Sequence, residues 1–186
     1  MDYQSFYARL FAPLEARLGP LDPDTLTSIV GFDAGGPLSL CTIGHGTGAD
    51  VVTYVSCELA VRDDQVPNAS GRYELVMSGD DADWIRQVLT DTAEMSLGSA
   101  FNDGDTLDIG AWVDDDDGSG QSLQGLLFQQ ELALNLDGAP VGVLRAIGIT
   151  RAELELARAQ GGDAVVARLQ DAGVYPHTLV GRASLV

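Results

Sequence analysis

The alternation of apolar and polar residues along the chain predicts strands and helices that pack together. In Arg72–Met77 one face carries Tyr73, Leu75 and Met77, whereas Arg72 and Glu74 take the other. This period-two pattern is typical of a half-buried strand. Because helix signals follow at once, we expect the chain to fold back here and lay a helix on the sheet.

A capped amphipathic helix is predicted directly after this strand. Ser78–Asp81 offers turn residues and N-caps, with acidic charge near the positive end of the helix. From Trp84 onward one stripe of residues recurs at helical spacing. The stripe consists of Ile85, Val88, Leu89, Thr92 and Ala93. We expect the core to include Tyr73, Leu75, Trp84 and Leu89.

An aromatic-rich helix is predicted over Tyr3–Leu18, within residues 1–20. Its apolar stripe consists of Tyr3, Phe6, Tyr7, Leu10, Phe11, Leu14 and Leu18. Gly19 and Pro20 then end the helix. Such a stripe is more often a core contact than a ligand cage.

Strands dominate the next stretch. Thr25–Phe32 and Leu38–Ile43 are predicted strands joined by a turn at Gly35–Pro37. The glycine-rich Gly44–Gly48 lacks the Lys-Ser/Thr ending of a phosphate loop, so we interpret it as a turn. Val51–Val61 is predicted to be one long strand.

The second half adds more strands and a hairpin. Leu107–Val113 is a predicted strand, and Leu123–Phe128 and Glu131–Leu136 are predicted to be extended. Asp137-Gly138 is a strong hairpin signal, with Val141–Ile149 as the returning strand.

The C-terminal part is predicted to be mainly helical. Thr150–Glu153 is a capping box that opens a helix through Ala159. Asp163 is predicted to cap a second helix, closed by Gly173. Val174–Val180, interrupted by Pro176, is predicted to add an edge strand. With no repeat and no long linker, the pattern predicts one α+β domain, a mixed or antiparallel sheet packed with helices.

Charge narrows the choice of partners. The formal net charge is −18, and all ten basic residues are arginine. This charge would repel phosphate backbones and anionic lipid, so nucleic acid and membrane are not expected partners. It would favour a basic protein partner, or it simply maintains solubility. The chain shows neither a signal peptide nor an apolar run of about 20 residues, so we expect a cytoplasmic protein.

No catalytic or metal-binding constellation is visible in the sequence. Cys41 and Cys57 are interpreted as reduced thiols, and His45 and His177 lie far apart. A Cys57–His177 dyad remains an alternative, because spatial neighbours need not be sequence neighbours. The acidic run Asp114–Gly120 fails the EF-hand spacing. We therefore predict no catalytic residues, no metal and no cofactor.

Several segments occur in an order that resembles the suppressor of fused domain family. They are Arg72–Met77, Trp84–Ala93, Phe101–Leu107, Leu126–Phe128, Val141–Ile149 and Thr150–Ala157. The resemblance extends over residues 25–186 and is strongest from Gly71 to Gly161. It departs from the family where Thr42-Ile43-Gly44 continues as His45-Gly46.

The resemblance implies a non-enzymatic domain that binds a protein. Asp105 is the one position that it assigns to the partner-facing residues; a turn aspartate is the alternative. We expect the partner at a strand edge or at the Phe101–Leu107 loop, where Phe101 and Asp103 are the other candidate residues. Animal members carry a second domain that closes on a Gli-type peptide, which we do not expect for this single domain. Bacterial members stand alone, and some are thought to be immunity proteins.

Three functions therefore remain open. The first is an immunity protein that sequesters a basic toxin. The second is an intracellular regulator or scaffold with another partner. The third is an enzyme that uses Cys57 or His45.

Overall fold

The computed structural model describes residues 3–30, 38–44, 51–112 and 123–186. The elements, in chain order, are α1 (Tyr3–Leu18), β1 (Leu21–Val30), β2 (Leu38–Ile43), β3 (Val52–Cys57), β4 (Arg72–Gly79), α2 (Ala82–Met95), β5 (Thr106–Asp108), β6 (Leu123–Leu136), β7 (Ala139–Thr150), α3 (Arg151–Gln160) and α4 (Gly162–Asp171).

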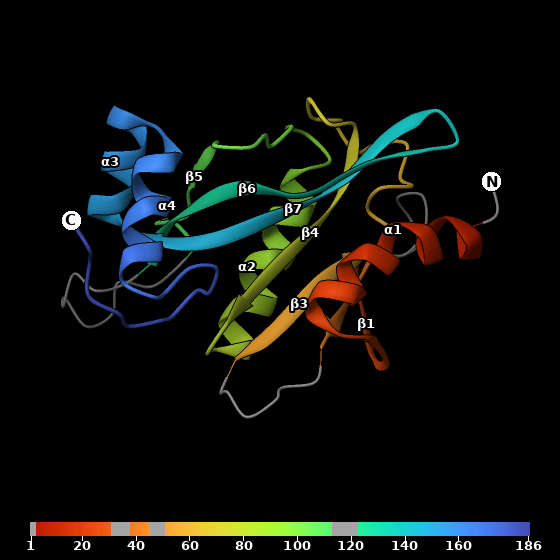
Figure 1. Ribbon diagram of the computed structural model, residues 1–186, viewed down its shortest axis with the longest axis horizontal. Helices are drawn as coiled ribbons and strands as arrows, with labels where there is room; N and C mark the ends of the chain where they lie inside the picture. Colours follow the sequence, from red (N-terminus) through yellow and green to blue (C-terminus); the bar gives the residue numbers. More distant parts are fainter. Residues whose placement is uncertain (1–2, 31–37, 45–50, 113–122) are drawn as a thin grey trace.

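The strands form one seven-stranded sheet in the order β1-β2-β3-β4-β7-β6-β5 (Figure 1). Neighbouring strands are antiparallel except β4 and β7, which run parallel. The parallel pair is possible because α2, β5 and β6 lie between β4 and β7 in sequence and form a crossover connection. The predicted α+β fold with a mixed sheet is confirmed.

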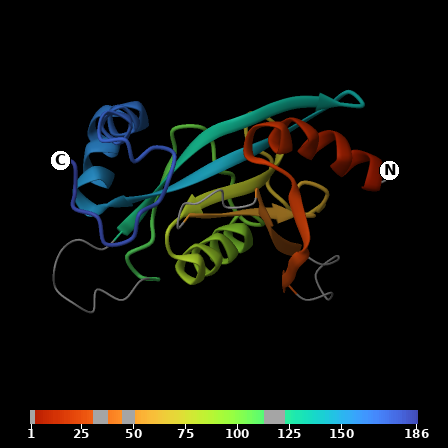
Figure 2. The ribbon, with the colours of Figure 1, turned by 60° about the horizontal axis from the view of Figure 1, so that its bottom comes forward.

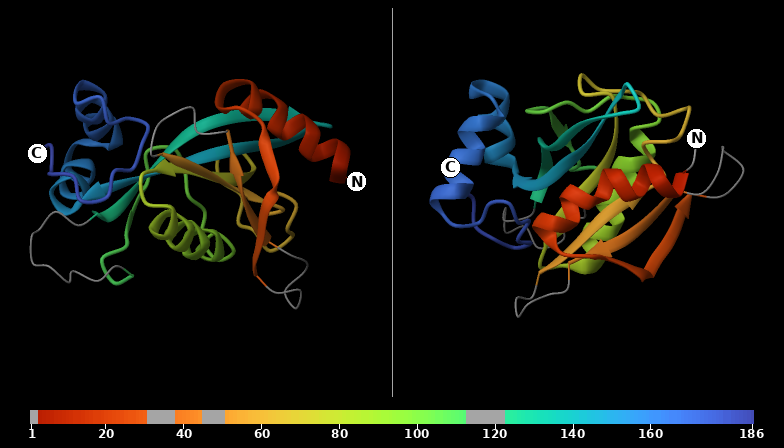
Figure 3. Two further views of the ribbon diagram at one scale, coloured as in Figure 1. Left: turned by 90° about the horizontal axis from the view of Figure 1, so that it is seen from below. Right: turned by 45° about the vertical axis from the view of Figure 1, so that its right-hand side comes forward.

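One face of the sheet is covered by α2 (Figure 3). Asp81 caps this helix by accepting hydrogen bonds from the main-chain N–H groups of Asp83 and Trp84. Its buried stripe is the predicted one, Ile85, Val88, Leu89, Thr92 and Ala93. The core beneath it contains the predicted Tyr73, Leu75 and Leu89, with Trp84 partly buried at its border.

The opposite face carries two separate helical layers (Figure 2). Helix α1 packs on β2, β3 and the outer part of β6–β7, where Phe6, Leu10 and Leu14 are buried. Helices α3 and α4 cover the other end of β6 and β7. The capping box at Thr150 and Glu153 is confirmed.

Helix α1 also changes the environment of β4. Glu74 was predicted on the exposed face of a half-buried strand, but its side chain is fully buried. The strand is covered by α2 on one side and by α1 on the other, which the period-two pattern could not show.

Two predicted strands are shorter in the structure. β3 ends at Cys57 because Glu58 adopts a positive φ of 78°, so the predicted strand over Val51–Val61 is wrong after Cys57. The prediction for Leu107–Val113 is also too long, since β5 stops at Asp108 and Ile109–Trp112 forms a turn.

Three further expectations need correction. The segments Leu123–Phe128 and Glu131–Leu136 are one strand, β6, with a register shift between Gln130 and Leu132. Helix α4 has Gly161 as its N-cap, so Asp163 lies in the first turn instead. Val174–Val180 forms no strand; Thr178 only makes an isolated bridge with Gly79.

Turn chemistry is confirmed where the structure describes it. At the β6–β7 hairpin, Asp137 and Gly138 have φ values of 55° and 85°, as a primed turn requires. Gly71 has a φ of 96°, and a Cβ atom there would lie 2.1 Å from the carbonyl oxygen of Pro140. Only glycine therefore allows β4 to approach β7 at this point.

Some predictions lie outside the described residues. They are the turn at Gly35–Pro37, most of the Gly44–Gly48 loop including His45, and the acidic run Asp114–Gly120. Within the described ranges, no helix is both long enough and apolar enough to cross a membrane.

Candidate protein-binding edge

The loop Phe101–Asp105 and strand β5 form one edge of the sheet. β5 pairs with β6 through Thr106, Leu107 and Asp108, and among the described strands it has no neighbour on its other side. Such an edge can accept an added strand from another chain.

The hydrogen-bond pattern shows which main-chain groups of β5 face outward. Phe128 N–H donates to the carbonyl oxygen of Asp105, and Ile109 N–H donates to that of Gln124. In an antiparallel ladder this spacing turns the N–H and C=O groups of Leu107 toward β6. The same groups of Thr106 and Asp108 then point away from β6, toward the open side.

The two predicted aspartates of the loop have different surroundings. Asp103 is exposed, and its Oδ1 accepts a 2.7 Å hydrogen bond from the main-chain N–H of Gln130. Asp105 is half-buried, and its Oδ2 accepts hydrogen bonds from the main-chain N–H and the Nδ2 of Asn102. Asp105 therefore has the contacts of a turn aspartate while it also lies beside the edge.

Phe101 does not lie on the surface. Its side chain is 6% exposed, and its ring stacks on Phe128 with centroids 4.5 Å apart. Its main-chain N–H donates to the Tyr73 hydroxyl, and its carbonyl accepts from Asn68 Nδ2. Of the three residues predicted to face a partner, Phe101 is therefore buried under the loop, whereas Asp103 is exposed and Asp105 is partly exposed.

Asp108 also lies on this edge, with its charge compensated by arginines, and was not among the predicted site residues. Arg151 pairs with its carboxylate, and Arg158 lies 3.5 Å from it. Hydrogen bonds from Arg151 and from the Gly110 main chain lower the pKa of Asp108. The sequence offered no direct signal for this pairing, because the two arginines lie on a helix more than 40 positions away.

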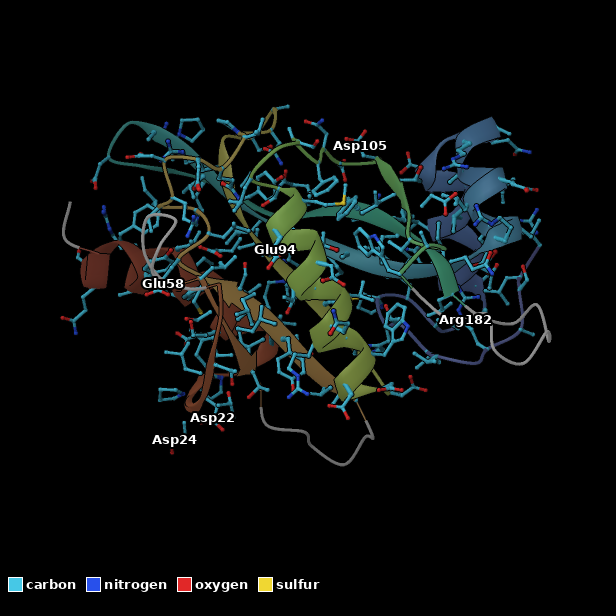
Figure 4. The ribbon with its side chains drawn as sticks, turned by 180° about the vertical axis from the view of Figure 1, so that it is seen from behind. Asp22, Asp24, Glu58, Glu94, Asp105 and Arg182 are labelled. Atoms are coloured by element: carbon cyan, nitrogen blue, oxygen red, sulfur yellow. The ribbon has the colours of Figure 1, made fainter. Side chains whose placement is uncertain are left out.

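The other edge of the sheet, β1, is built differently. Its pairing with β2 is interrupted by register shifts between Asp22 and Thr27 and again after Ser28, and Pro23 removes one donor. Bulges and proline hinder strand addition. Figure 4 shows Asp22 and Asp24 at this end and Asp105 at the opposite end, so acidic charge alone does not distinguish the two edges.

A buried carboxyl lies under α1, away from both edges. Glu74 accepts hydrogen bonds from the Tyr7 hydroxyl (2.9 Å), the Ser56 hydroxyl (2.5 Å) and the Ala60 N–H (2.8 Å). Burial outweighs these bonds and raises the pKa of Glu74 to about 7. Glu74 therefore has the contacts of a structural residue that links α1 to the sheet.

The alternative Cys57–His177 dyad is not assembled. His177 lies next to Thr178, which bridges Gly79, and Gly79 pairs with Val52 at the start of β3. Cys57 is the last residue of β3, roughly 17 Å further along the strand. Among the described residues, no group of three or more His, Cys, Asp or Glu side chains is arranged to hold a metal ion.

The class that these features define is an α+β scaffold, in which a mixed sheet is covered on both faces and ends in an open edge strand. The sequence matches the family described as Suppressor of fused protein (SUFU) over residues 36–183. The chain therefore belongs to the suppressor of fused family, as the motif order predicted.

Solved structures agree on the fold. The chain is similar to a SUFU homologue from Neisseria gonorrhoeae, with 18% identity, a TM-score of 0.65, and coverage of 100% of this chain and 98% of that one. It is also similar to a chain of the Sufu-Fu complex, with 16% identity, a TM-score of 0.67, and 98% and 91% coverage.

Drosophila Suppressor of Fused gives 18% identity and a TM-score of 0.57; the match covers 83% of this chain but only 44% of the fly chain. This chain therefore spans less than half of that protein. No curated protein sequence matches the chain.

Proposed function

We propose that this chain is a non-enzymatic, cytoplasmic domain that sequesters a partner protein at the β5 edge. The observation that carries the proposal is the open edge itself, with the main-chain groups of Thr106 and Asp108 turned outward. One of the similar structures comes from the Sufu-Fu complex, in which a member of the family is bound to a protein.

The partner that suits this edge is a basic protein with an extended segment. Main-chain hydrogen bonds to Thr106 and Asp108 would supply affinity, as in other cases of strand addition. The carboxylates of Asp103 and Asp105 flank the same edge, and the net charge of −18 would speed encounter with a cationic surface. We propose a secreted toxin as this partner, which makes the chain a bacterial-type immunity protein; a regulatory partner is the alternative.

Two variants test the edge without disturbing the fold. Thr106→Pro removes an N–H that is not used for pairing with β6. Asp103→Asn keeps the oxygen that accepts from Gln130 but removes the charge. Asp163→Asn, on the exposed first turn of α4, is the matched charge control.

The experiment is affinity capture from the native organism with the wild-type chain and these variants. We expect one protein to be retained by wild type and Asp163→Asn, and to be lost or at least tenfold weaker with Thr106→Pro. Asp103→Asn should weaken capture mainly at low salt, because exposed charges are screened. Equal capture by all four chains would place the interface elsewhere.

The identity of the captured protein separates the two partner classes. A toxin encoded by the neighbouring gene should lose its toxicity when this chain is co-expressed. Absence of both complex and protection with that gene product would rule out the immunity role and leave the regulatory one.

A further inference from the structure

The two cysteines of the chain lie side by side beneath α1. Cys41 on β2 is opposite Val55 on β3, and Ser39 is opposite Cys57. The cysteines are therefore diagonal neighbours on the same face of the sheet. Their Sγ atoms are 3.4 Å apart, and both residues are free thiols.

The two thiols differ in access. Cys41 is 3% exposed and belongs to the apolar cluster that α1 covers, whereas Cys57 is half-buried at the border of that cluster. Cys57 is therefore the more accessible residue of the pair. The second thiol is then already in contact with it, sheltered from other reactants.

We propose that Cys41 and Cys57 are a thiol-oxidation site, which closes to a reversible disulfide and braces β2 against β3 beneath α1. Disulfide sulfurs are about 2.05 Å apart, so the bond requires the two Sγ atoms to approach by about 1.4 Å. The half-buried Cys57 is the first point of attack, and Cys41 is the resolving thiol.

The reaction requires a disulfide oxidant, for which oxidised glutathione is the probe. The Cys57 sulfur loses its proton and attacks one sulfur of the oxidant; a new S–S bond forms and one glutathione thiolate leaves. The Cys41 sulfur then loses its proton and attacks Cys57 Sγ, which releases the second glutathione thiolate. The protein loses two protons and two electrons, and the oxidant is reduced to two thiols.

The register makes this bond easy to reverse. Diagonal neighbours on paired strands have Cα atoms about 7–8 Å apart, beyond the usual range of about 4.4–6.8 Å for a disulfide. The strands must move closer when the bond forms, so strain offsets part, but not all, of the stability that the contact between the two thiols gives to the bond. The site is therefore suited to reversible oxidation.

The test is equilibration of the wild-type chain with mixtures of oxidised and reduced glutathione, followed by acid quenching and mass spectrometry. We expect the folded protein to lose two mass units and both alkylatable thiols together, with peptide mapping linking Cys41 to Cys57. Half of the folded chain should be oxidised at a ratio of oxidised to reduced glutathione that is at least about tenfold lower than the ratio needed for the chain unfolded in guanidinium. The reason is that folding holds the two thiols together. Dithiothreitol should restore both thiols.

The single variants serve as controls. Cys41→Ser should stop at a glutathione adduct on Cys57, and Cys57→Ser should stay unmodified while folded. If either variant fails to fold, the wild-type comparison between folded and unfolded chain still decides. Three results would each overturn the proposal. They are a glutathione adduct that persists on wild-type Cys57, a disulfide between two chains, and oxidation of folded and unfolded chain at the same glutathione ratio.

Discussion

The buried carboxyl of Glu74 should make the stability of the protein depend on pH near neutrality. Glu74 has an ordinary pKa of 4.5, and burial raises the pKa to about 7 in the folded protein. The folded state therefore holds this proton more tightly than the unfolded state. Its contribution to stability is fully present below pH 4.5 and is lost as the pH rises through 7.

The size of the effect follows from the two pKa values. Each pKa unit corresponds to about 1.4 kcal/mol. With a folded pKa of about 7 and an unfolded pKa of 4.5, linkage predicts that Glu74 alone removes about 2.5 kcal/mol of unfolding free energy between pH 5 and pH 8. The Tyr7 hydroxyl is not expected to titrate in this range, because burial and Glu74 raise its pKa.

Urea denaturation of wild type and Glu74→Gln across this pH range measures the effect. Glutamine keeps an oxygen that can accept from Tyr7 and Ala60, but it cannot ionise. The difference in unfolding free energy between the two proteins should therefore change by about 2.5 kcal/mol from pH 5 to pH 8, in favour of the variant at high pH. Glu155→Gln, at an exposed position on α3, is the control and should show no such change. If this difference stays constant across the range, the pKa of Glu74 is not raised in the folded protein.

Three further predictions concern stability and can be checked by urea or thermal unfolding. Gly71→Ala should cost about 3 kcal/mol or more, because it combines a positive φ with a main-chain clash, whereas Gly104→Ala, with a positive φ but open space, should cost only about 1–2 kcal/mol. Thr150→Ala should cost about 1 kcal/mol through loss of the capping box, and Thr150→Ser should restore most of it; equal losses would exclude the cap as the cause. Arg145→Met should cost about 2 kcal/mol, because the Glu131 carboxylate loses its buried 2.7 Å partner and keeps only the more exposed Arg17, 2.8 Å away; adding Glu131→Leu should recover part of the loss.

Local structure was largely readable from the sequence. The periodic stripes located α1, α2 and the start of α3, and the Asp137-Gly138 turn located the β6–β7 hairpin. These signals are local, since a helix or hairpin repeats over a few residues and its caps are side chains next to it. The order of such motifs also sufficed to predict the suppressor of fused family.

The ends of strands were less readable. β3 stops at Cys57 although apolar residues continue through Val61, because Glu58 takes a left-handed conformation. The pattern of apolar and polar residues does not predict this conformation. Val174–Val180 has the composition of a strand but makes only one bridge with β4. A strand exists only where a partner strand is in reach, and that depends on the whole fold.

In the candidate site, too, some features can be read from the sequence and others depend on the whole fold. The carboxylates of the Phe101–Asp105 loop and the strongly acidic character of the chain are read directly from the sequence. The fold, in contrast, is needed to show that Phe101 is buried against Phe128 and that Thr106 and Asp108 face an open edge. Burial and edge position arise from contacts between residues far apart in the chain, whereas periodicity reports only the near ones.

The face of the sheet opposite α2 depends most clearly on contacts between residues far apart in the chain. Tyr7 reaches Glu74 across 67 positions, and the two cysteines meet because β2 and β3 pair in one particular register. A shift of that register by one residue would turn each side chain to the other face of the sheet. The sequence determined which residues could titrate or react, and the packing of α1 on the sheet decided which of them are buried together.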